Sequence, residues 1–253
     1  MDKKYKLINE TINVNGHTLH RIKALRDFGN VKKGELGGFI ESEGNLSQDG
    51  LCWVFAEAKV YGDAMVGGNA MVYGSARVYG SARVYGNARV FDDAMVSGDA
   101  RVCGNAIVSG DAMVFDHAVI QRDVKVFGHA MVFASARVSD NAEIYGNAKV
   151  SGHARIGKFA HITSPNDYIV IGPLGSRDAY TTVYRVRNTD VHACSSDLRI
   201  QCGCFNGTPD EFFATVDKTH KKGTIYHTQY TTIIKFMTDT MCQMTISNGD
   251  DEK

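Results

Sequence analysis

A Val or Ile recurs at every sixth position from Val54 to Ile162 without any change of phase. Ala stands four residues after each of these positions from Ala58 to Ala160, with Val124 as the exception. A period of six matches neither the 3.6-residue period of a helix nor the simple alternation of a flat strand. It is typical of a β-solenoid, in which a short extended piece carries the inward Val or Ile and a Gly-Asn or Gly-Asp turn follows.

Three six-residue sides make a triangular coil in which the Val or Ile and the Ala both point inward. Six such coils, stacked at about 4.8 Å, form a prism about 30 Å long. The composition agrees, because many of the 26 glycines mark corners and none of the 3 prolines precedes Pro165. Proline would remove donors from the stacked ladders. The sequence therefore predicts an all-β main domain built as a single-stranded parallel β-helix.

The Val-Tyr-Gly-Asn-Ala-Arg-Val hexads across residues 40–164 resemble the hexapeptide-repeat, left-handed parallel β-helix superfamily, particularly its YdcK-like branch. The segments 21–28, 37–43 and 45–47 are similar to phage and prophage members of that branch. The resemblance implies a left-handed winding and trimers packed side by side. Many members of the superfamily are acyltransferases, in which a histidine between subunits acts as general base.

The two ends of the repeat are predicted to be covered, because a solenoid exposes its core at both ends. The Asn15-Gly16 turn signal predicts an N-terminal hairpin, and Pro165-Asn166-Asp167 marks the end of the hexads. Thr208-Pro209-Asp210-Glu211 is a helix start. Further strands are expected at 168–171, 181–186 and 198–202, and a second helix at about 226–244. The expected domains are a β cap at 1–50, the solenoid at 51–164, a small α+β domain at 165–247 and a disordered tail at 248–253.

Two of the three prism faces are predicted to be apolar, because the residues that flank each inward Val or Ile point outward. The first face carries Trp53, Phe55, Tyr73, Phe91, Phe127 and Tyr145, and the second carries Met95, Met113, Phe115, Met131 and Phe133. Exposed apolar surfaces of this size mark interfaces. We expect a homo-oligomer, with a trimer favoured by the resemblance and a dimer or a partner-binding face as the next candidates. The alternative is that the aromatic ladders stabilise the stacked coils, and the two interpretations are compatible.

The third face carries a column of arginines that is interrupted by Val119, and the corner beside it offers hydroxyl and imidazole groups. The column contains Arg83, Arg101, Arg137 and Arg155, and the corner contains His117, Ser135 and His153. A phosphate or nucleotide fits such a set of donors. Repulsion along the column calls for a negative group, and Asp99 could serve near Arg101. The alternative, which the sequence favours, is a solvated arginine ladder with bulk counter-ions. A second candidate anion site is Ser176 and Arg177 in a Gly-rich segment. The alternative, which the sequence favours, is an ordinary strand-to-strand loop.

The sequence favours a protein without catalytic residues, metal or cofactor. His117, His129 and His153 replace the usual corner Asn or Asp, but no loop interrupts the hexads to build an acyltransferase site. Cys202 and Cys204, with Cys194 nearby, lack a second pair at zinc-ligand spacing.

We interpret the chain as a non-catalytic, phage-type β-helix binding protein. It would act as an anti-defence factor that sequesters an anionic nucleotide signal or blocks a host defence protein. The alternatives are a hexapeptide-repeat acyltransferase and a structural or virion-associated component. With 28 basic and 28 acidic residues, bulk nucleic-acid binding is not expected. No apolar run is long enough for a membrane span. We expect a cytoplasmic protein with free thiols, in the host cytoplasm if it is phage-encoded.

Overall fold

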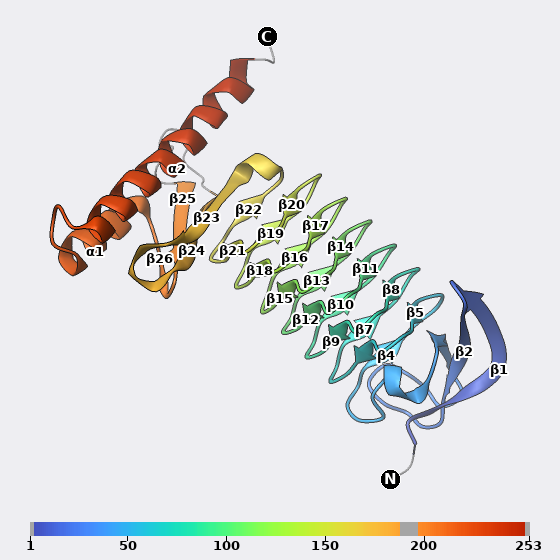
Figure 1. Ribbon diagram of the computed structural model, residues 1–253. Helices are drawn as coiled ribbons and strands as arrows, with labels where there is room; N and C mark the ends of the chain where they lie inside the picture. Colours follow the sequence, from blue (N-terminus) through green and yellow to red (C-terminus); the bar gives the residue numbers. More distant parts are fainter. Residues whose placement is uncertain (1–2, 188–196, 251–253) are drawn as a thin grey trace.

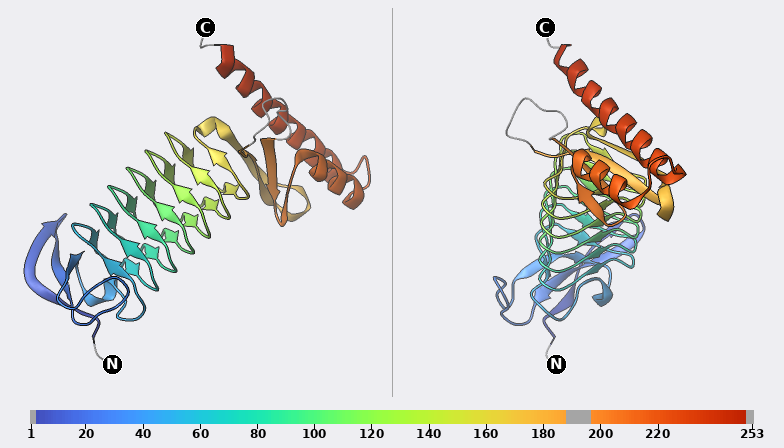
Figure 2. Two further views of the ribbon diagram at one scale, coloured as in Figure 1. Left: turned by 180° about the vertical axis from the view of Figure 1, so that it is seen from behind. Right: turned by 90° about the vertical axis from the view of Figure 1, so that its left-hand side faces the viewer.

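A computed structural model of the protein describes residues 3–187 and 197–250. A long solenoid of parallel coils occupies the middle of the molecule (Figures 1 and 2). A β cap covers one end of the solenoid, and a small α+β domain covers the other. The predicted β-solenoid with a small C-terminal α+β domain is confirmed.

Each side of a coil contributes one two-residue strand, and strands one coil apart pair in parallel. The first face contains β4 (Trp53–Val54), β7 (Met71–Val72), β10 (Arg89–Val90), β13 (Ile107–Val108), β16 (Lys125–Val126), β19 (Glu143–Ile144) and β22 (His161–Ile162). The second contains β5 (Lys59–Val60), β8 (Arg77–Val78), β11 (Met95–Val96), β14 (Met113–Val114), β17 (Met131–Val132) and β20 (Lys149–Val150). The third contains β6 (Met65–Val66), β9 (Arg83–Val84), β12 (Arg101–Val102), β15 (Val119–Ile120), β18 (Arg137–Val138) and β21 (Arg155–Ile156).

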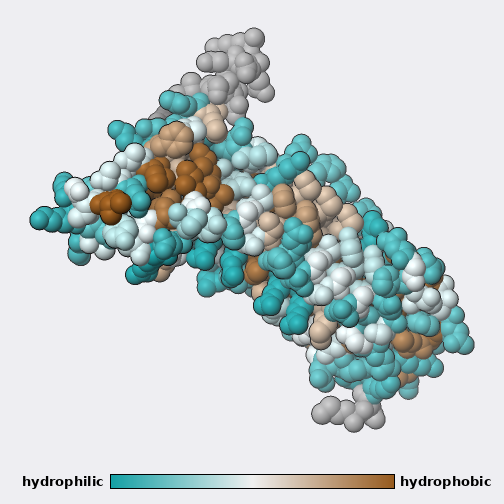
Figure 3. Space-filling view, viewed as in Figure 1, coloured by the Kyte–Doolittle hydropathy of each residue, from teal (hydrophilic) through white to brown (hydrophobic). Residues whose placement is uncertain are grey.

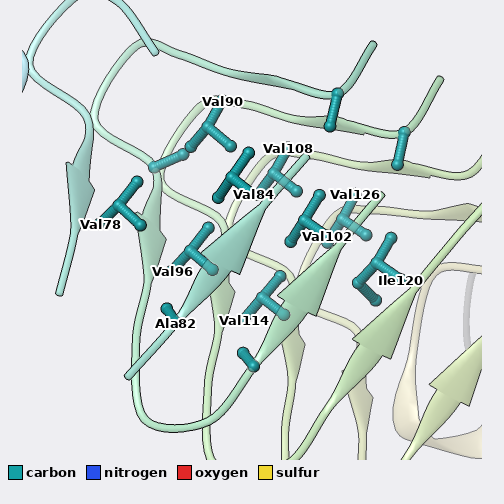
Figure 4. Packing of buried hydrophobic residues seen from close by; sticks show 14 of the residues in the cluster. Val78, Ala82, Val84, Val90, Val96, Val102, Val108, Val114, Ile120 and Val126 are labelled. Carbon is teal, nitrogen blue, oxygen red and sulfur yellow. The ribbon is translucent and has the colours of Figure 1, made fainter. Parts of the chain in front are cut away.

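The inward positions of the hexads form one continuous core. Every Val or Ile of the six-residue series and every Ala of the corner series is buried (Figure 4). Val124, which replaces Ala at one corner, is also buried. The apolar area removed from water is the main favourable contribution to folding, and the strict phase of the sequence follows from it.

The corners require backbone in the left-handed region, where glycine is least strained. Gly104 shows why, because its φ is +74° and an added Cβ would lie 2.6 Å from the backbone nitrogen of Arg122 in the next coil. Aspartate occupies some of these corner positions, and its carboxylate can accept a hydrogen bond from the backbone of the next coil. Asp92 accepts such a bond from the Gly110 N–H at 3.1 Å.

The N-terminal cap is a hairpin of β1 (Tyr5–Val14) and β2 (His17–Ala24), joined at Asn15-Gly16 as predicted. β2 pairs with β3 (Leu36–Ile40), which continues the second face by pairing in parallel with β5. The 3₁₀ turn η1 (Glu43–Asn45) and a bridge from Leu46 to Val66 complete an irregular first coil.

Trp53 is a core residue of this cap and not an interface residue, which corrects the sequence prediction. Its side chain is fully buried, and its ring contacts Tyr5 at 6.0 Å and Phe28 at 5.3 Å between centroids. The outward rule failed here because the residues before the first coil fold back over its outer surface.

The C-terminal domain is an antiparallel sheet covered by two helices. The sheet contains β23 (Tyr168–Leu174), β24 (Ala179–Arg185), β25 (Leu198–Cys202) and β26 (Phe205–Gly207). The helices are α1 (Pro209–Thr219) and α2 (Ile225–Asp250), and the 3₁₀ turns are η2 (Pro165–Asp167) and η3 (Gly175–Arg177). Thr208 caps α1 as expected, since its hydroxyl accepts from the Glu211 N–H at 3.2 Å.

The predicted disordered tail is wrong for residues 248–250, which belong to α2. Once the earlier turns of α2 are formed, each further residue adds a hydrogen bond at small cost. Residues 251–253 lie outside the described residues. In the part of the chain that the structure covers, no helix combines the length and apolar character needed to cross a membrane. A cytoplasmic location stays a prediction.

The outward residues of the first and second faces form ladders of stacked rings. Tyr73 stacks on Phe91 at 4.7 Å, and Phe127 stacks on Tyr145 at 4.8 Å, between centroids. These side chains remain half-exposed in the single chain. In the view of Figure 3, the most apolar surface lies over the C-terminal helices. In α2, Ile225 is 67% exposed and Phe236 is 61% exposed. Ring stacking is therefore observed, and an interface role stays a prediction.

Candidate functional site

The corner between the second and third faces presents His117, Ser135 and His153 on three successive coils. Each lies three residues after the inward Val of β14, β17 or β20. Arg137 and Arg155 follow two residues after Ser135 and His153 and are register partners on β18 and β21. The repeat therefore brings together five side chains that the sequence analysis singled out.

These five residues and Tyr180 line a surface pocket of about 280 Å³, which we call the corner pocket. Tyr180 comes from β24 of the C-terminal domain. Its ring stacks on His153 with a centroid distance of 4.1 Å and an interplanar angle of 22°. The Arg155 N–H donates to the Thr182 hydroxyl at 3.0 Å, which anchors β24 on the last coil. The pocket thus lies at the junction of the solenoid and the C-terminal domain.

Tyr180 was missed by the sequence analysis because it lies outside the repeat. The 18-residue stride places side chains only within the hexads, which end at Ile162. No sequence signal links an aperiodic strand to a particular corner of the last coil.

The corner pocket is basic at its Arg137–Arg155 side. None of the described residues that line it is acidic. Asp99 lies at the other side of the pocket, where its carboxylate is 3.2 Å from His117 Nδ1. Both partners are largely exposed, so this ion pair contributes little to stability. The arrangement can hold an anion through charge-assisted hydrogen bonds.

The remaining predicted anion ligands lie elsewhere. Arg101 is on β12, and Val119 on β15 separates it from Arg137 in the same column. Ser176 and Arg177 are in η3 and line a different pocket within the C-terminal domain. The corner and the Gly-rich segment are therefore two separate candidate sites, each with its own pocket.

The histidines and cysteines within 3–187 and 197–250 do not assemble a metal-binding set. His129 pairs with Asp111 at 3.3 Å on a different corner from His117. Among the described residues, no group of three or more His, Cys, Asp or Glu side chains is placed to hold a metal ion.

The described cysteines of the C-terminal domain include both free thiols and a disulfide-bonded residue. Cys202 and Cys204 are free, and burial raises the pKa of the Cys202 thiol. Cys242 is disulfide-bonded, which contradicts the expectation that all thiols are free. Cys194, considered above as a zinc ligand, lies outside the described residues.

Comparison with known families agrees with the architecture. Residues 66–80, 82–98 and 100–114 match the family described as the YdcK β-solenoid repeat. The chain is a hexapeptide-repeat β-solenoid protein. The matched segments end at residue 114, before the first residue of the corner pocket in the sequence. The match does not test membership of the phage-type branch, which stays a prediction. No curated protein matches the chain in sequence.

Proposed function

We propose that the protein is a non-catalytic binding protein whose corner pocket captures a small phosphorylated nucleotide. The observation that carries this proposal is the convergence of Arg137, Arg155 and two histidines with the ring of Tyr180 around one pocket. Cationic donors suit a phosphate, and aromatic rings suit a base.

Phosphate binding is supported by the juxtaposition of Arg137 and Arg155. They occupy adjacent positions on β18 and β21, and both side chains are exposed. Two such charges one coil apart repel by about 1 kcal/mol in water and by about 3 kcal/mol at the effective dielectric of a protein surface. An anion between them removes this repulsion and accepts planar, forked hydrogen bonds from both guanidinium groups. The Ser135 hydroxyl and the His153 imidazole lie beside the two guanidinium groups and add further donors.

Base binding is supported by the stacked pair of His153 and Tyr180. Base–aromatic stacking contributes about 1–3 kcal/mol per base. Because Tyr180 belongs to the C-terminal domain, that domain completes the pocket and does not only cover the end of the solenoid. In a phage-type protein, capture of a host nucleotide signal would act as anti-defence by lowering the free concentration of the signal.

Replacing Arg137 and Arg155 together by alanine is expected to weaken nucleotide binding by about 100-fold or more, since each charged hydrogen bond contributes about 1.5–3 kcal/mol. Isothermal titration with AMP, ATP, cyclic AMP and inorganic phosphate measures this loss. Arg83→Ala with Arg101→Ala is the matched control, because these arginines share the column and lie outside the pocket. Tyr180→Ala should weaken the binding of the nucleotides and leave the binding of inorganic phosphate unchanged. Absence of binding, or equal loss in the control, contradicts the proposal.

We further propose that the apolar faces join copies of the chain side by side. Met95, Met113 and Met131 are register neighbours on the second face, next to the stacked pair of Phe115 and Phe133. Burying half-exposed apolar side chains against a second copy removes them from water. Native mass spectrometry should give an oligomer, with a trimer expected, and Met113→Glu with Met131→Glu should shift it to monomer. A monomeric wild-type chain contradicts this proposal.

A further inference from the structure

The C-terminal domain contains a second pocket, of about 200 Å³, that the proposed function does not use. It opens between η3, the β25–β26 hairpin and the two helices, and we call it the domain pocket. None of the described residues that line it is acidic.

One wall of the domain pocket is formed by packed apolar side chains. Phe205 contacts Phe212 edge-to-face at 5.1 Å, and Phe212 contacts Tyr230 in the same way at 5.8 Å. Phe212 and Tyr230 are buried, and the buried Val216 completes this side. Packed aromatic side chains of this kind keep their rotamers, so the hollow between them is preformed.

Arg177 supplies a single cationic group at this apolar pocket. Its Nη1 donates to Cys204 Sγ at 3.6 Å, and a cysteine sulfur is a weak hydrogen-bond acceptor. Within 3–187 and 197–250, no ion pair involves this guanidinium. The Ser176 hydroxyl and the His220 ring line the same pocket and can donate beside it. An unpaired cation beside an apolar hollow is complementary to a ligand that joins an anionic group to an apolar body.

We propose that the domain pocket binds a small organic carboxylate with an apolar body. The carboxylate accepts forked hydrogen bonds from Arg177, and the body lies among Phe205, Phe212 and Tyr230. An apolar cavity of about 150 Å³ holds a benzene molecule. The domain pocket therefore accommodates one ring with a short acidic arm, and it is too small for a nucleotide.

The test is titration of the full chain with 3-phenylpropanoate, followed by calorimetry or ligand-observed NMR. Binding with a Kd on the order of a millimolar or tighter is expected for a ligand of this size. The uncharged 3-phenylpropan-1-ol should bind at least tenfold more weakly. Arg177→Met keeps most of the length of the side chain and removes its charge, so it should weaken the binding of 3-phenylpropanoate by about 10- to 100-fold. Arg177 is exposed, and its replacement leaves the core intact.

A second readout uses the thiol in contact with Arg177. Bound 3-phenylpropanoate should slow alkylation of Cys204 by N-ethylmaleimide, and half-exposed Cys103 on the solenoid is the internal reference. The proposal is overturned if 3-phenylpropanoate does not bind or if the acid and the alcohol bind equally. It is also overturned if Arg177→Met binds the acid as tightly as the wild type does. The Arg137→Ala, Arg155→Ala variant should bind 3-phenylpropanoate like the wild type, so failure at one pocket is distinguishable from failure at the other.

Discussion

Replacing Trp53 by alanine is expected to lower the free energy of unfolding by about 3–5 kcal/mol, as for other large buried aromatic side chains. Trp53 fills the space between the first coil and the cap, where it is in contact with Tyr5 and Phe28. Alanine leaves a cavity that the stacked coils cannot close, because their spacing is set by the backbone ladders. Urea denaturation followed by far-UV circular dichroism measures the loss.

Trp53→Phe is the matched control for this experiment. Among the described residues, the buried Trp53 Nε1 has no hydrogen-bond partner. Phenylalanine keeps most of the ring contacts and removes this unpaired donor, so the loss should stay below about 1.5 kcal/mol. Met71→Ala, one coil further along the first face and half-exposed, should also cost little. A loss in the free energy of unfolding that is no larger for Trp53→Ala than for Met71→Ala would contradict a core role for Trp53.

Replacing Gly175 by alanine is expected to cost about 4 kcal/mol or more and to detach α2 locally. Gly175 has a φ of +74°, and a Cβ at this position would overlap the hydroxyl and Cζ of Tyr230. The Tyr230 ring must then leave its buried position and its contact with Phe212. Loss of a large aromatic side chain from a core costs about 3–5 kcal/mol, and the left-handed backbone adds about 1–2 kcal/mol. Hydrogen exchange in α2 and thermal unfolding measure the effect.

Gly203→Ala separates the two contributions. Gly203 lies in the same domain with a φ of +58°, and an added Cβ meets nothing within 4 Å. Its replacement should therefore cost only about 1–2 kcal/mol for the left-handed backbone and leave exchange in α2 unchanged. Equal losses in the two variants would show that the Tyr230 contact is not what Gly175 protects.

The hexads were sufficient to place almost every side chain of the solenoid. Since one coil is 18 residues, His117, Ser135 and His153 had to share a corner, and Arg137 and Arg155 had to be neighbours. The inward Val, Ile and Ala were assigned to the core for the same reason, and they are buried. Exact periodicity converts a distance along the chain into a position in space.

Both errors in assigning residues to the outer surface or to the tail arose where the repeat gives no information. Trp53 follows the hexad rule, yet the cap covers it, because the open end of a solenoid must be shielded from water. Residues 248–250 were expected to be disordered, but α2 continues through them. Local composition does not record what an aperiodic segment packs against.

The sequence by itself determined the stacked coils, their inward core and the composition of the three faces, because a repeated local interaction needs no information from distant residues. Only the tertiary structure decided what lies against the ends of the solenoid. It brought Tyr180 onto His153 and placed Arg177 beside the apolar pocket of the C-terminal domain. These contacts join segments with no common period, so they depend on how whole domains pack and cannot be obtained from spacing along the chain.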